Sequence, residues 1–164
     1  MTTKNDFTAE EWELVSGLPG LVIAGAAWSD GKMVPAVREV VAGGEVLQKA
    51  GLAAPEGSLV RDLFSGAADS KETKAAMSGD DKPASPQAAV ELLTAKVGDA
   101  FGVLAAKATP EEVAGVRSTL EETAKAVVER LGSGFWGSGS EKVSEGEKAY
   151  LERLATVLGD APAS

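Results

Sequence analysis

The chain has 164 residues, 44% of them apolar, which is enough to form the core of one domain spanning 1–164. Its formal net charge is −9, so it lacks the basic surface needed to bind nucleic acid or an anionic membrane. It contains neither cysteine nor histidine, which excludes disulfides, thiolate chemistry and zinc sites built from those residues. We therefore expect a cytoplasmic protein that binds no nucleic acid.

The first predicted helix has a clear start. Thr8 and Glu11 are spaced as a capping box, in which each side chain accepts a hydrogen bond from the backbone of the other residue. Phe7 and Trp12 flank this start at positions where two apolar side chains often pack together. The pattern predicts a helix from this cap to about Ser16.

Three more helices are predicted before the middle of the chain. The apolar segment 18–28 is shorter than the roughly 20 residues that span a bilayer, so it is predicted to be a buried helix rather than a membrane span. The next helix is predicted to start near 34–35 and to end just before Gly51, because glycine is common at the position that follows a helix end. A short helix is expected after Ser58.

Residues 66–84 are polar and have few apolar side chains, so we expect a mobile linker between two helical halves. Beyond it, Ser85 before a proline predicts the start of a long helix. Thr109 with Glu112, and Ser144 with Glu147, repeat the capping-box spacing and predict two more helix starts. The sequence thus predicts an all-α, single-domain bundle of about six to seven helices in two pseudo-repeated halves.

The pseudo-repeat is based on two polar turns. Asp30-Gly31-Lys32-Met33 and Ser140-Glu141-Lys142-Val143 each end in an apolar residue and lead into a helix with a nearby charged pair. An apolar helix, then Asp-Gly, then a helix carrying Glu, occurring twice, resembles the tellurite-resistance TerB-like helical family. The second half is the closer match, from Val143 through the helix that ends near Gly159, although Ser140-Glu141 stands where that family has Asp-Gly.

This resemblance implies a helical stress-response protein, not an enzyme, with acidic turns that bind a divalent cation. The residues it marks as metal ligands are Asp30, Glu39 and Glu147. A purely structural role fully accounts for two of them, since Glu147 is placed to cap a helix and Asp30 lies in a turn.

The pair Phe135 and Trp136 lies in a glycine-rich segment and has two interpretations. One is an exposed anchor for a protein partner or for self-association; the other is a plug that folds back on the end of the bundle. Without histidine or cysteine the common nucleophilic triads are excluded, so an enzyme would have to work through carboxylates or lysine alone. We expect a non-enzymatic protein, either TerB-like with weak cation binding or a protein-interaction or oligomerisation module.

Overall fold

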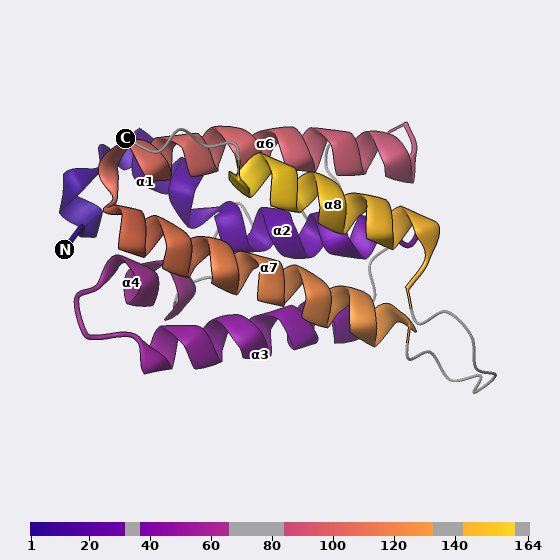
Figure 1. Ribbon diagram of the computed structural model, residues 1–164, viewed down its shortest axis with the longest axis horizontal. Coiled ribbons are helices and arrows are strands. Elements are labelled where there is room, and N and C mark those ends of the chain that lie inside the picture. Colours follow the sequence, from indigo (N-terminus) through magenta and orange to yellow (C-terminus); the bar gives the residue numbers. More distant parts are fainter. Residues whose placement is uncertain (32–36, 66–83, 133–142, 160–164) are drawn as a thin grey trace.

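All the regular secondary structure in the described part of the chain is helical. The computed structural model describes residues 1–31, 37–65, 84–132 and 143–159. A 3-10 turn, Lys4–Asp6, precedes the α-helices, which are α1 Ala9–Ser16, α2 Leu18–Trp28, α3 Val37–Ala53, α4 Leu59–Ser65, α6 Pro86–Lys107, α7 Pro110–Gly132 and α8 Glu145–Gly159 (Figure 1). The predicted all-α bundle is confirmed. Most of the expected 66–84 linker, residues 66–83, lies outside the described residues.

The helix starts predicted from capping boxes are confirmed, whereas the start predicted near 34–35 lies outside the described residues. The backbone N–H of Glu11 donates to Thr8 Oγ1 at 3.2 Å, and that of Thr8 donates to Glu11 Oε2 at 2.7 Å. Thr109 and Glu112 make the same reciprocal pair at 3.4 and 3.0 Å. These bonds occupy backbone donors that the first turn of a helix leaves without partners, so local sequence alone sets where α1 and α7 begin.

The predicted end of α3 at Gly51 is wrong, because the helix continues to Ala53. Gly51 is buried, and a Cβ atom added to it would lie 3.1 Å from the backbone nitrogen of Ser65 and 3.3 Å from the carbonyl carbon of Phe64. The glycine therefore allows α4 to lie close against α3, and it does not terminate the helix.

Helix α2 forms the centre of the molecule, and every residue from Leu18 to Trp28 is buried. It packs against α3, α6, α7 and α8, so helices from both halves of the chain surround it (Figure 1). A helix that is apolar on all sides must be covered on all sides, and the amphipathic neighbours do this. No helix in the described ranges is both long and apolar enough to cross a membrane.

Glycine brings α8 close to this central helix. The Tyr150 ring lies over Gly25, where an added Cβ would be 2.6 Å from the phenolic oxygen. The Tyr150 hydroxyl donates to the carbonyl oxygen of Val22 at 2.9 Å, and both groups are buried. The tyrosine thus fixes the position of α8 along α2.

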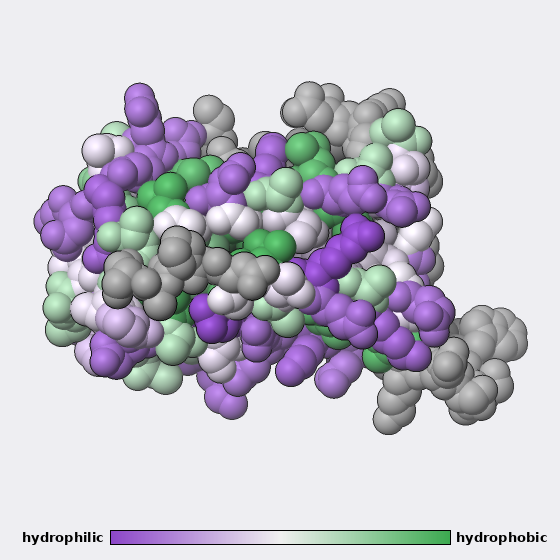
Figure 2. Space-filling view, turned by 45° about the horizontal axis from the view of Figure 1, so that its top comes forward, coloured by the Kyte–Doolittle hydropathy of each residue, from purple (hydrophilic) through white to green (hydrophobic). Residues whose placement is uncertain are grey.

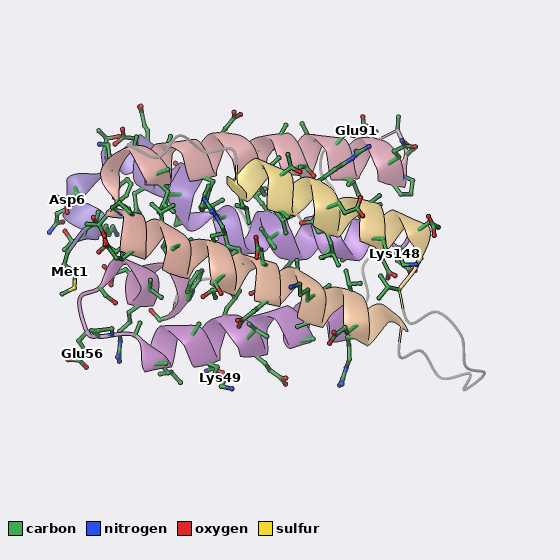
Figure 3. All side chains as sticks on the ribbon, viewed as in Figure 1. Met1, Asp6, Lys49, Glu56, Glu91 and Lys148 are labelled. Atoms are coloured by element: carbon green, nitrogen blue, oxygen red, sulfur yellow. The ribbon has the colours of Figure 1, made fainter. Side chains whose placement is uncertain are left out.

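The N-terminal segment is held at the opposite end of the bundle, where Figure 3 shows Met1 and Asp6. The backbone N–H of Thr2 donates to Glu112 Oε1 at 2.8 Å. Lys107 Nζ donates to Glu11 Oε2 at 2.7 Å and to the backbone oxygen of Asp6 at 3.0 Å. These contacts join the first residues to the turn between α6 and α7.

The carboxyl groups of this network have lowered pKa values. The hydrogen bond from Lys107, followed by that from the Thr8 backbone, holds the pKa of Glu11 below its ordinary 4.5. Burial alone would raise the pKa of Glu112, but its hydrogen bonds with Thr2 and Thr109 outweigh burial and lower it. Both groups therefore stabilise the fold in the ionised form.

Replacing Gly25 with alanine should lower the free energy of unfolding by about 1–3 kcal/mol, because the new methyl group overlaps the Tyr150 ring. Gly102→Ala in α6 is the matched control. Its Cβ meets nothing within 4 Å, so helix propensity should raise the free energy of unfolding by about 0.5–1 kcal/mol. Urea unfolding measures both changes. Equal effects of the two substitutions would contradict the close packing of α8 on α2.

Lowered carboxyl pKa values stabilise the fold above the ordinary pKa of 4.5, and this stabilisation is lost as the pH falls through the lowered values. The urea midpoint should therefore fall as the pH is lowered from about 6 to about 3, and Glu11→Gln should make that fall shallower. Glu10→Gln removes the same charge from an exposed neighbouring position. An identical pH dependence in both variants would refute this role of Glu11.

Candidate binding groove between α6 and α8

The residues singled out from the sequence lie in different parts of the molecule. Asp30 lies half-buried in the turn after α2, and Glu147 lies in the first turn of α8 with only 2% of its surface exposed. Glu39 belongs to α3, but its side chain is outside the part that the structure describes. Phe135 and Trp136 also fall outside the described residues, so both interpretations of that pair stay predictions.

The structure does bring the end of α2 and the start of α8 together. A Cβ atom added to Gly146 would lie 2.6 Å from the carbonyl oxygen of Ser29, so the two segments touch through a glycine. Glu147 completes the third predicted capping box: its Oε2 accepts from the Ser144 N–H at 2.5 Å, and its own N–H donates to Ser144 Oγ at 3.3 Å. The carboxylate therefore caps α8.

Among the described residues, no group of three or more acidic side chains lies close enough together to hold a metal ion. Glu39 cannot be placed relative to Asp30 and Glu147, so the cation site stays a prediction. Asp30 and Glu147 nonetheless lie on segments that touch.

Next to this contact, a partly open hollow of about 430 Å³ lies between the turn after α2, the start of α6 and α8. It is more enclosed than a second hollow beside it, and we call it the deep hollow. Its size is at the lower end of the range for ligand pockets, about 300–1,000 Å³. No acidic side chain is among its lining residues, and its walls are mostly apolar. They include Trp28, Pro86, Val90, Ala149, Tyr150 and Arg153.

A second, shallower hollow of about 540 Å³ continues along the same two helices. It shares Ala149 and Arg153 with the deep hollow, so the two lie next to each other, and we call them together the α6–α8 groove. The surface of this hollow is also mostly apolar, but two carboxylates belong to its walls, whose further residues are Glu91, Thr94, Ala95, Glu152, Thr156 and Val157. Figure 2 shows apolar side chains in small patches between polar ones on the upper face of the molecule.

The spacing of the lining residues explains why a groove forms. On α8 the positions 149, 152, 153 and 156 fall three or four residues apart, and on α6 the positions 87, 90, 91, 94 and 95 do the same. Each set is one stripe of a helix. From Gly146 to Val157 the α8 stripe is about 16 Å long. The small side chains of these stripes, such as Ala95 on α6 and Ala149 on α8, leave space between the two helices.

The ionisable groups of the groove differ along its length. In the deep part, burial raises the pKa of the Tyr150 hydroxyl above its usual range, so this group stays protonated and donates to the core. Where the two hollows meet, Arg153 NH1 lies 3.8 Å from Glu91 Oε1. Figure 3 labels Glu91 on α6. Half of the Arg153 side chain and 58% of the Glu91 side chain are exposed. The charges therefore face solvent along the rim.

Sequence reasoning did not identify the residues of this groove. Trp28 was expected to be a core residue, and it is buried, but it also forms part of the wall of the deep hollow. The available signal was the spacing of small side chains on α8, at Ala149 and Thr156, on a helix whose apolar face lies elsewhere. This signal does not reveal that α6 is the facing helix.

Comparison with known proteins adds no relative. No protein-family model matches the chain, and neither a curated protein nor a solved structure matches it. The resemblance to TerB-like proteins therefore gains no support and meets no contradiction. The indications of function come from the chemistry of the groove.

Proposed function

We propose that this chain is a non-enzymatic binding module that takes up a segment of a protein partner in the α6–α8 groove. The observation that carries the proposal is that two mostly apolar hollows lie next to each other along α6 and α8 and share Ala149 and Arg153 in their walls. The deep hollow can take one apolar anchor side chain of the partner, and the shallow hollow can take the residues of the partner segment on one side of that anchor.

The dimensions support a peptide as the occupant. An extended chain advances about 3.3 Å per residue, so five residues cover about 16 Å, the length of the α8 stripe. The walls are formed by α6, which packs on α2, and by α8, which two glycine contacts hold against the core, Gly25 under Tyr150 and Gly146 against Ser29. A site on rigid helices needs little ordering when a partner binds.

The chemistry of the lining supports a non-catalytic role. The titratable side chains in the wall of the deep hollow are Tyr150 and Arg153, and neither serves as a general base near neutral pH. The chain has no histidine or cysteine to take that part. Binding without chemistry is the function that these residues support best.

The proposal predicts that filling the deep hollow abolishes binding while the fold is kept. The probe is acetyl-leucine amide, which presents one neutral apolar side chain, and binding is measured from shifts of the Trp28 indole and Gly146 backbone N–H signals by NMR. Ala149→Trp should remove the saturable shifts, because the new ring occupies the space between α6 and α8.

Ala155→Trp is the matched control, since it adds the same ring at another exposed position on α8, outside the groove. This variant should keep the shifts. Saturable shifts centred on α3 and α4, or none in the groove of the unaltered protein, would contradict the proposal.

We infer, as a second candidate, weak cation binding at the contact between the turn after α2 and the start of α8, in line with a TerB-like role in stress response. Its support is that Asp30 and Glu147 lie on segments that touch through Gly146. Clustered carboxylate oxygens are the ligands that calcium prefers.

Calcium at millimolar concentration should then raise the melting temperature, and Asp30→Asn should remove that rise. Asp62→Asn, which neutralises an exposed carboxylate on α4, should keep it. Melting temperatures independent of calcium in all three proteins would exclude the cation site.

A further inference from the structure

We propose that the partner segment carries a basic residue two positions from its apolar anchor, and that Glu152 and Glu91 select for it. This inference rests on the proposed function, because it specifies the chemistry of the same groove. Its basis is the distribution of charge along the lining residues, together with the spacing between the two hollows.

The acidic side chains lie in only one part of the groove. The deep hollow has no acidic side chain in its wall, whereas Glu91 and Glu152 line the shallow hollow, one from each helix. Glu152 is exposed, and its carboxylate makes no hydrogen bond or ion pair within the described part of the chain. Glu91 contacts Arg153 only at 3.8 Å, with both side chains at least half exposed.

The balance of charge in the shallow hollow favours a cation. The walls of the shallow hollow hold two negative side chains, Glu91 and Glu152, and one positive side chain, Arg153. The whole chain, these residues included, has a net charge of −9. A segment with a positive side chain at this place is therefore attracted both locally and at long range, whereas an acidic segment is repelled. Arg153 turns toward Glu91 and leaves the Glu152 carboxylate for the incoming cation.

The spacing follows from helix and strand geometry. Glu152 lies three residues after Ala149, which is about 4.5 Å along α8. Alternate side chains of an extended peptide lie on one face, about 6.6 Å apart. A side chain two positions from an anchor in the deep hollow thus lies past Ala149, which lines both hollows, and over the shallow hollow, whose walls include Glu152 and Glu91.

Three acetylated and amidated tripeptides test this inference, with leucine first, serine second and lysine, glutamine or glutamate third. A second set has the residues in the reverse order, because the groove does not fix the direction of the bound chain. Dissociation constants come from NMR titration at low salt. In at least one order, the lysine peptide should bind about two- to fivefold more tightly than the glutamine peptide, and the glutamate peptide most weakly.

Variants separate local from overall charge. Glu152→Gln should reduce the preference for lysine over glutamine to near onefold, while Glu129→Gln on α7, which changes the net charge equally, should keep it. Arg153→Gln should increase the preference for lysine. Melting temperatures verify that each variant is folded.

The outcomes distinguish the two proposals. If all the peptides bind in the groove with equal affinity, the basic-residue inference is overturned and the proposed function stands. If Glu129→Gln reduces the preference as much as Glu152→Gln, the selection comes from overall charge and the inference is likewise overturned. If no peptide shifts the signals of the groove, both proposals fall.

Discussion

The fold depends on covering one helix. All eleven residues of α2, Leu18–Trp28, are buried, and none of them is charged. This helix therefore has no polar face that could be exposed to water. The only stable arrangement places other helices around its full circumference. Small residues on α2 let them approach closely, as Tyr150 does over Gly25. The groove follows from the same constraint, because α2 ends at Trp28 while α6 and α8 begin beside it, and the deep hollow lies where the central helix stops.

The sequence predicted the helices well because their ends depend on neighbouring residues. The capping boxes at Thr8, Thr109 and Ser144 use side chains within three residues of each other, so short-range spacing identifies them. Gly51 was misjudged because its role depends on α4, which contacts it from another part of the chain. The groove could not be predicted for the same reason, because it needs the pairing of α6 with α8, and no local pattern encodes which helices pack together.

The carboxylates show how one residue type serves two purposes in this acidic chain. Glu11, Glu112 and Glu147 accept backbone hydrogen bonds at helix starts, and Glu147 is almost wholly buried while doing so. Glu91 and Glu152 lie on exposed helix stripes and have no such task. Their positions differ: Glu11, Glu112 and Glu147 occupy the capping position in the first turn, whereas Glu91 and Glu152 lie beyond the first turn and are exposed.

The long reach of the Tyr150 contact has a consequence for biosynthesis. The hydroxyl bonds to the carbonyl of Val22 across 128 residues of chain, and α6, α7 and α8 all pack on α2. A ribosome releases the apolar helix α2 well before α6, α7 and α8, which cover it and follow it in the chain. Until then the emerging polypeptide presents an uncovered hydrophobic segment, which is the kind of surface that chaperones recognise. The bundle therefore completes its core only after nearly all of it has been synthesised, and not progressively from the first helices.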